Sequence, residues 1–218
     1  MLTSNPLARV PLILCVMLIG CATTAPRAAR PSAAVGSGQP LAPPSLAALP
    51  ELPRTAPTNA QRMHQALTLA QQVFAAQLPA APDDRSCASL QAWVEQQVAP
   101  WVEKRRDAVA DTRFQFGPAE AQQAADVVVE RAVLGLLQED TALELAGIPS
   151  PSELDEEPEI AAMFRDLIRG QAQPFVSSAR DEYRHCVETG QHGADDLRRF
   201  GDFCRTRLSR LGPSDPKH

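Results

Sequence analysis

The fold of this chain is decided by one stretch, Val127-Val128-Val129-Glu130-Arg131-Ala132-Val133-Leu134-Gly135-Leu136-Leu137. Wound as an α-helix, this stretch is apolar on most sides, and a helix of that kind is buried among other elements. It is too short to cross a hydrocarbon core of about 30 Å, and Glu130 and Arg131 interrupt it. We therefore predict that it is the central helix of a folded domain.

Glycine and proline mark the expected ends of the central helix. Gly117-Pro118 precedes it, and proline is favoured at the first helical position, so we expect the helix to open there with Glu120 in its first turn. Gly147 followed by Pro149 is a stop signal. The predicted helix therefore extends beyond the apolar stretch on both sides.

Two helices are predicted after the central one. An acidic loop, residues 152–159, leads into the first, where carboxylates complement a helix N-terminus. Calcium binding is the alternative, but the loop lacks the alternating ligands and central glycine of an EF-hand. Gly170 and Pro174 should break or kink this helix. The apolar stripes are Ile160, Phe164, Leu167, Ile168, Phe175, Ala179, Tyr183 and Cys186, then Leu197, Phe200, Cys204, Leu208 and Leu211.

Two helices are also predicted before the central one. Thr58-Asn59-Ala60-Gln61 fits a capping box, and Pro79 ends the helix that follows it. The second begins near Asp84 or Ser86, should kink at Pro100 and ends in a solvated cluster, residues 104–107. The apolar stripes are Met63, Leu67, Ala70, Phe74 and Leu78, then Cys87, Leu90, Val94, Val98 and Trp101.

Composition favours an all-α fold. Runs of β-branched and aromatic residues are scarce, whereas the helix formers Ala, Leu, Gln, Glu and Arg are plentiful. We predict an irregular bundle of about five or six helices over residues 58–212, followed by a frayed tail at 213–218. The net charge of −5 argues against a basic surface for nucleic acid.

Residues 21–57 have a different character. Prolines recur through them, Ala, Ser, Gly and Thr fill most of the rest, and there is no apolar periodicity. Such a stretch cannot bury enough apolar surface to offset the entropy lost on ordering. We interpret it as a disordered, Pro/Ala-rich tether in front of the helical domain.

The first twenty residues follow the pattern of a secretory signal. Arg9 supplies the positive n-region, and residues 10–20 are apolar apart from Pro11 and end in a small residue before Cys21. Such a run makes roughly 16 Å of helix, too short for a lasting membrane span. We predict that residues 1–20 are a signal peptide.

The end of that segment, Leu18-Ile19-Gly20-Cys21, resembles the lipobox of bacterial lipoproteins. The resemblance implies that Cys21 becomes the first mature residue, with a thioether-linked diacylglycerol and usually an amide-linked acyl chain such as palmitate. Two or three chains anchor a protein stably, whereas one gives marginal binding. Ala22 favours the periplasmic face of the outer membrane in enteric members of the family. The alternative is an ordinary signal peptide with an incidental cysteine.

Cys87, Cys186 and Cys204 remain for the folded domain. Disulfides persist in an oxidising envelope, and we predict a Cys186–Cys204 bridge between the inward faces of consecutive helices. The alternative is that all three are buried core thiols. Cys87 is expected to stay outside the bridge, and its apolar face argues against an activated thiolate.

The turn between the last two helices tests this bridge. Bridged Cα atoms lie within about 7 Å, so a turn centred near residues 194–195 is needed to align the two cysteines. The first helix should then run to about His192, with Gly193 after it. A stop at Gly190 would make the bridge doubtful.

The segment from Ala179 to Leu211 is similar to a tetratricopeptide-type hairpin, because an aromatic residue and a cysteine recur on both of its helices. Cysteine-bearing hairpins of this kind are found in Gram-negative envelope proteins. The segment lacks the Trp-Leu-Gly consensus core, and no second copy follows at a 34-residue period. The resemblance therefore implies a helical hairpin and no repeat array.

No catalytic motif stands out. The chain has no G-x-S-x-G nucleophile elbow, no H-E-x-x-H or paired Cys-x-x-Cys spacing and no glycine-rich phosphate loop. We therefore predict no catalytic residues, no metal site and no cofactor. The alternative is an envelope hydrolase or small-ligand carrier with a pocket between helices, in which Glu, His or Tyr183 converge.

The function that the sequence favours is binding. We expect a lipid-anchored envelope protein whose helical domain acts as a scaffold, assembly factor or accessory subunit for a protein partner. The expected partner contacts are arginines placed off the apolar stripe of the last helix; the alternative is that they are simply solvated. These residues are Arg198, Arg199, Arg205, Arg207 and Arg210.

Overall fold

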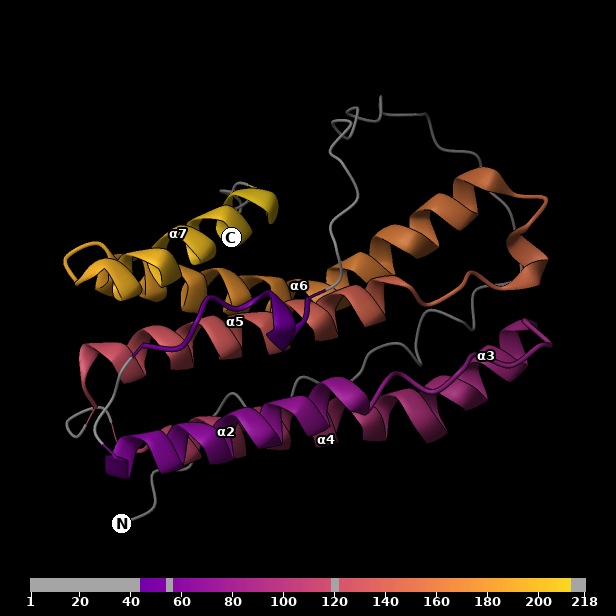
Figure 1. The fold of residues 1–218 in the computed structure, drawn as a ribbon. Coiled ribbons are helices and arrows are strands. Elements are labelled where there is room, and N and C mark those ends of the chain that lie inside the picture. The colour runs from indigo at the N-terminus through magenta and orange to yellow at the C-terminus, as the bar shows by residue number, and fades with distance from the viewer. Residues whose placement is uncertain (1–43, 54–56, 119–121, 213–218) are drawn as a thin grey trace, which may run out of the picture.

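The computed structural model describes residues 44–53, 57–118 and 122–212 (Figure 1). Every long regular element within them is a helix, so the fold is all-α as expected. The signal, Cys21 and the tail at 213–218 lie outside the described residues. The long elements are α2 (Pro57–Ala75), α3 (Cys87–Trp93), α4 (Ala99–Phe116), α5 (Ala124–Ala146), α6 (Pro158–Gly190) and α7 (Asp195–Arg210).

Helix α5 is the centre of the domain, as the apolar stretch predicts. It contacts α2, α4, α6 and α7, and Figure 1 shows it between the α2/α4 pair and the α6/α7 pair. Its side chains are buried in several directions, which is the reason for the near-continuous apolar run. The fully buried ones include Val128, Val129, Val133, Leu134, Leu136 and Leu137.

The start of α5 differs from the prediction. The helix begins at Ala124, where a reciprocal capping box joins Gln123 and Asp126, and not near Pro118. Gly117 instead ends α4, because its φ of 90° is a left-handed conformation that glycine adopts without strain. Glu120 lies outside the described residues. The predicted stop is confirmed, since α5 ends at Ala146 and Gly147 caps it.

The kink expected at Pro100 takes the form of a π-helical turn, η3 (Val94–Val98), between α3 and α4. The N–H of Ala99 bonds to the Val94 carbonyl, five residues back. Pro100 has no N–H and its ring crowds the preceding turn, and the wider π-helical turn directly precedes it. Because the helix continues to Phe116, residues 104–107 lie in its middle and not at a solvated end.

Helix α6 is continuous over 33 residues, with Pro174 inside it. The predicted break at Gly170 does not occur, although the ribbon bends along its length (Figure 1). Pro174 lies on the exposed side, where water can satisfy the carbonyl that loses its donor.

Two apolar clusters fill the bundle from end to end. The larger joins α2, α4, α5, α6 and α7 around buried residues such as Val129, Leu134 and Phe200. The smaller joins α3, η3 and α4 to the C-terminal end of α5 and the first half of α6, around Trp93, Trp101 and Phe175. Among the described helices, none is both long enough and apolar enough to cross a membrane.

Residues 44–53, which we call the strap, are ordered against this body. They contain a single 3-10 turn, η2 (Leu46–Ala48), capped by the Ser45 hydroxyl. Leu46 and Leu49 pack against the larger cluster, and Pro44 and Pro53 are buried. The predicted disordered tether therefore extends too far, because the leucines between its last prolines have apolar surface to pack on.

Candidate functional site

The described structure joins Cys186 and Cys204 in a disulfide, with Cα atoms 6.2 Å apart, so the predicted pairing is confirmed. Both cysteines are fully buried. The predicted turn is wrong, however: α6 stops at Gly190 and α7 begins at Asp195. The bridge forms in spite of the earlier stop, so the end of α6 does not decide which residues face each other.

Two glycines decide that register. A Cβ built on Gly190 would lie 2.9 Å from the Gly201 Cα, so a side chain there would collide with α7 backbone. The two backbones are in contact at this pair, and further pairs follow at helical spacing. From the loop outward these pairs, which we call the α6/α7 ladder, are Gly190 with Gly201, Cys186 with Cys204, Tyr183 with Arg207, and Arg180 with the Leu211 carbonyl.

The third pair of the ladder closes over a buried carboxylate on α5. The Tyr183 hydroxyl donates to Glu139 Oε2 at 2.7 Å, and Arg207 Nε donates to the same oxygen at 3.0 Å. All three side chains are sealed from solvent, with Tyr183 fully buried and Glu139 and Arg207 1% and 4% exposed. This Tyr–Glu–Arg triad ties α5, α6 and α7 together.

Gly135 makes room for the triad. A Cβ at this position would lie 2.5 Å from Tyr183 Cε1, so the tyrosine ring occupies the space over the glycine. Glu139 lies one turn later on the same face of α5, where the hydroxyl reaches it. Burial, and then the neighbouring Glu139, raise the pKa of Tyr183 well above its ordinary value, so the phenol stays a proton donor.

A second ionic cluster includes Glu182, the residue immediately before Tyr183 on α6. Glu182 forms ion pairs with Arg113 on α4 and, at 2.8 Å, with Arg131 on α5. The buried Glu130 accepts a hydrogen bond of 2.7 Å from Gln122 and lies 3.8 Å from Arg113. Burial raises the pKa of Glu130, because the carboxylate has lost most of its water.

A third buried charge sits in the smaller apolar cluster. Arg105, only 2% exposed, forms an ion pair of 2.6 Å with Asp140 and stacks 4.8 Å from the centre of the Trp101 ring. Burial raises the pKa of Asp140, with Arg105 opposing that shift. The prediction of a solvated basic cluster at 104–107 is therefore wrong for Arg105.

The predicted partner-binding arginines divide into two groups. Arg207 is buried in the triad and cannot meet a partner, because position 207 follows Phe200 and Cys204 on the inward face of α7. The other four are exposed. Arg198 and Arg205 pair with Asp195 and Asp202 one turn earlier, Arg199 lies 3.9 Å from Glu51 of the strap, and Arg210 is also on the surface.

The acidic loop fastens α3 to the start of α6. Glu153 accepts a hydrogen bond of 2.8 Å from the Cys87 N–H, and Asp155 pairs with Arg85 at 2.9 Å. The bond from the Cys87 backbone lowers the pKa of Glu153, a favourable use of a carboxylate at a helix start. In the described part of the chain, no three His, Cys, Asp or Glu side chains gather so as to hold a metal ion.

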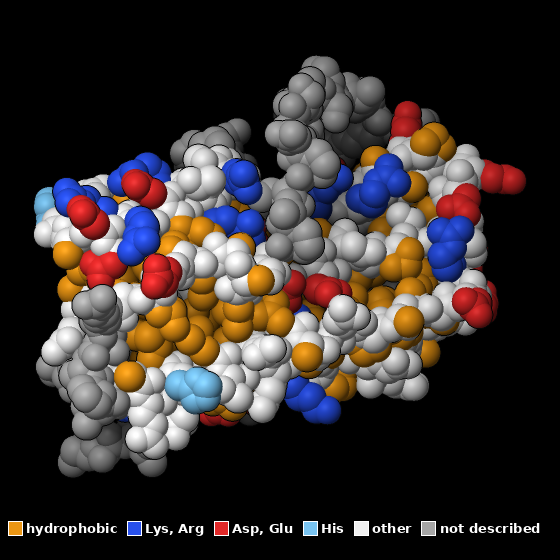
Figure 2. Space-filling view, viewed as in Figure 1, with side chains coloured by type: hydrophobic (Ala, Val, Ile, Leu, Met, Phe, Trp, Pro, Cys, Tyr) orange, Lys and Arg blue, Asp and Glu red, His pale blue; other side chains and the backbone are white. Residues whose placement is uncertain are grey.

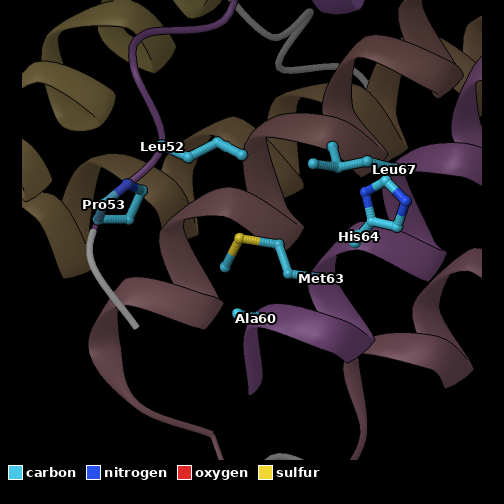
Figure 3. A pocket seen from close by; sticks show the side chains of 6 residues that line it. All are labelled: Leu52, Pro53, Ala60, Met63, His64 and Leu67. Atoms are coloured by element: carbon cyan, nitrogen blue, oxygen red, sulfur yellow. The ribbon is translucent and has the colours of Figure 1, made fainter. Parts of the chain in front are cut away.

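An apolar cavity of about 250 Å³ lies between the strap and α2 (Figure 3). Leu52 and Pro53 of the strap face Ala60, Met63 and Leu67, with His64 at the side. Ligand sites are usually larger, about 300–1,000 Å³, and offer several converging polar groups. This cavity has one imidazole and is better suited to an apolar side chain.

Comparison with known proteins adds no family to this description: no protein-family model, no curated protein and no solved structure matches the chain. The triad is not predictable from the sequence, since nothing in the sequence pairs Glu139 with Arg207. One signal was present, because Glu139 follows the apolar stretch on the helix predicted to be buried, and a buried carboxylate needs a partner.

Proposed function

We propose that the protein is a lipid-anchored lipoprotein of the bacterial cell envelope, held to the membrane through acyl chains on Cys21. The observation that carries this proposal is the sequence Leu18-Ile19-Gly20-Cys21 at the end of a short apolar run. A buried Cys186–Cys204 bridge supports it, because disulfides persist in oxidising compartments. By the rule that holds for enteric lipoproteins, Ala22 favours the periplasmic face of the outer membrane.

We also propose that the helical domain acts by binding a protein partner, as a scaffold, assembly factor or accessory subunit. In the described body, Glu139, Tyr183 and Arg207 are sealed inside the bundle and engaged with one another, which suits a rigid support and not a reaction centre. The hydrolase or ligand-carrier alternative has less support, because the carboxylate and phenol that it would use are inaccessible. The exposed arginines of α7 are the proposed contacts.

Metabolic labelling tests the anchor. The full chain is expressed in a Gram-negative host fed an alkyne analogue of palmitate, and the membrane and soluble fractions are separated. Wild type should take up the label and sediment with membranes, whereas Cys21→Ser should lose both properties. Cys87→Ser is the matched control and should behave as wild type. Equal labelling of Cys21→Ser would refute lipidation at this residue.

Crosslinking in intact envelopes tests the binding role. Wild type should give reproducible crosslinks from α7 to one protein, identified by mass spectrometry. The combined change of Arg198, Arg199, Arg205 and Arg210 to Ala should abolish them, whereas Arg106→Ala and Arg169→Ala, at exposed positions on other helices, should not. Absence of any stable partner, or crosslinks that survive the α7 changes, would count against the proposal.

A further inference from the structure

The strap lies in a groove whose walls are formed by α2 and α7. Leu46 and Leu49 pack on the larger apolar cluster, while Leu52 and Pro53 face Met63 and the rest of the α2 wall. On the opposite side, the Glu51 carboxylate lies 3.9 Å from Arg199 of α7. Apolar side chains gather over this face of the molecule (Figure 2). The strap therefore covers part of an apolar surface of the bundle.

The fit of the strap in this groove is incomplete. The cavity of about 250 Å³ remains beside Leu52, and Leu52 itself is 44% exposed. Among the described residues, the hydrogen bonds made by the strap are internal to it, at η2 and its cap. The strap is thus held by its two buried end prolines, a few half-buried side chains and one long surface ion pair, which contributes little. Such a segment can be displaced without unfolding the helices.

We propose that the groove under the strap is a docking site for a partner protein, and that the strap closes it in cis. The occupant is a partner segment that forms one 3-10 turn and carries two leucines three residues apart between prolines. The seated strap itself defines this chemistry, because Leu46 and Leu49 reach the core from one side of the η2 turn, between Pro44 and Pro53. Prolines lower the entropy that such a segment loses when it binds. The inference rests on the proposed binding role and names its site.

Competition between strap and partner follows from their linkage. The strap is joined to α2 through only three residues, 54–56, and a short connection gives a local concentration on the order of mM. A partner segment of equal intrinsic affinity would therefore bind weakly. Its apparent affinity is its intrinsic affinity multiplied by the fraction of molecules in which the groove is open. A partner that also contacts α7 beside Arg199 would gain an advantage over the strap.

Peptide binding to the mature chain tests this proposal without depending on lipidation. The protein carries Cys21→Ser, and the probe is a fluorescein-labelled peptide with the sequence of residues 44–53. The double variant Leu46→Asp/Leu49→Asp releases the strap and leaves the groove intact. It should bind the peptide at least tenfold more tightly than the control Ala47→Asp/Ala48→Asp, whose changes are at exposed positions of the same turn. A peptide with both leucines changed to Asp should not bind.

A second measurement covers the case in which the released variant does not fold. A spin label on Ala48→Cys, in a Cys87→Ser background, reports strap mobility in an otherwise native chain. Excess peptide should mobilise the label, and Met63→Glu on the groove wall should mobilise it without peptide. Equal peptide binding by the released and control variants, or a label that excess peptide leaves immobile, would overturn the proposal. A wild-type dimer in sedimentation that Leu46→Asp/Leu49→Asp abolishes would overturn it too, since the occupant would then be the strap of a second copy.

Discussion

Arg207 and Glu139 depend on each other, because each is a charge removed from water. An ion taken into a protein interior loses several kcal/mol of hydration, and only a close, hydrogen-bonded partner offsets that loss. Arg207 Nε and the Tyr183 hydroxyl both bond to Glu139 Oε2, which satisfies one oxygen of the carboxylate. The other oxygen and Arg207 Nη2 have no hydrogen-bond partner among the described residues. Loss of another hydrogen bond within the triad would therefore leave a buried charge poorly compensated.

Removing Arg207 should therefore be costly. Arg207→Ala leaves the Glu139 carboxylate buried without a counter-ion, and we expect it to lower the free energy of unfolding by about 3–5 kcal/mol. Arg205→Ala, which removes an exposed arginine two residues away, should change it by less than about 0.5 kcal/mol. Urea denaturation measures both. The double variant Glu139→Gln/Arg207→Met should recover part of the loss, and equal losses in the two single variants would contradict the role of the triad.

Glu130 should make stability depend on pH. Its pKa in the folded protein is raised by burial above the ordinary value of about 4.3, so between these two values the native state binds more protons than the unfolded chain. The free energy of unfolding should then fall as the pH rises through this window. Glu130→Gln should flatten this fall in denaturant titrations carried out from the ordinary glutamate pKa upward, whereas Glu188→Gln, at an exposed position, should not. Parallel pH profiles for all three proteins would refute this.

The inward place of Arg207 could not be predicted from sequence alone. Phe200, Cys204, Arg207 and Leu211 share one helical face by spacing, but a charged residue in such a series is ordinarily assigned to the surface. The information that reverses the assignment is Glu139, which lies 68 residues away along the chain. Residue types and spacings within one helix contain no record of such a partner.

Between elements, glycine sets how closely the helices approach. Gly135 of α5 admits the ring of Tyr183, and Gly190 and Gly201 let α6 and α7 meet backbone to backbone. Helix pairs of this kind have one preferred register, because any shift places a side chain where only hydrogen fits. The α6/α7 ladder follows from that constraint, and the disulfide is one of its pairs.

Gly135→Ala should destabilise the α5/α6 contact. Its Cβ would overlap Tyr183 Cε1, and the ring cannot retreat because its hydroxyl is bonded to Glu139, so we expect a loss of about 1–3 kcal/mol. Gly170→Ala on α6 is the matched control. Nothing lies within 4 Å of its Cβ, and alanine is the better helix former, so stability should rise by about 0.5–1 kcal/mol. The two variants should therefore change the free energy of unfolding in opposite directions, which chemical denaturation measures.

The disulfide should stabilise a hairpin that is already correctly placed. It closes a loop of 18 residues, and Cys186→Ala/Cys204→Ala should lower the free energy of unfolding by about 3 kcal/mol while leaving the helical content unchanged. Adding reductant to wild type should lower its melting temperature towards that of the double variant, and Cys87→Ala should melt as wild type. If reductant shifts the double variant as far as it shifts wild type, the bridge is not the cause.

The helices themselves were largely predictable, and their ends were not. Apolar periodicity identified the central helix and the faces of its neighbours, because burial imposes the 3.6-residue period on the residues concerned. The sequence predicts a helix start at Gly117, but Gly117 ends a helix, since glycine serves either role depending on its φ. Pro100 and Pro174 predict kinks or breaks, but a π-helical turn and an exposed position accommodate them.

At the scale of the whole molecule, the strap enlarges the folded unit beyond the helices. Its leucines extend the larger apolar cluster, and its position connects α2 with α7, which are far apart in sequence. From sequence alone these residues belong to the proline-rich tether, because three leucines among prolines do not establish a helical period. Only the surface that they cover distinguishes them, and that surface is a product of tertiary structure.

Truncation should reveal the strap as part of the body. A chain that begins at Pro44 keeps it, whereas one that begins at Arg54 loses the burial of Leu46 and Leu49. We expect the shorter chain to be less stable by about 2 kcal/mol, since fully burying a leucine contributes roughly 1.5–3 kcal/mol and these are half-buried. Urea unfolding of the two chains gives the difference. Equal stabilities would restore the interpretation of residues 44–53 as tether.

The ion pair between Glu139 and Arg207 also has a consequence for how the chain is made. Ribosomes add about 5–20 residues per second, so the 68 residues that separate the two side chains take roughly 3–14 s to synthesise. Throughout that interval Glu139 exists without its counter-ion, and a core closed around it would hold a bare carboxylate. A core that closed around Glu139 alone would bury an unpaired charge, so we expect α5, α6 and α7 to pack together only once Arg207 is available to it.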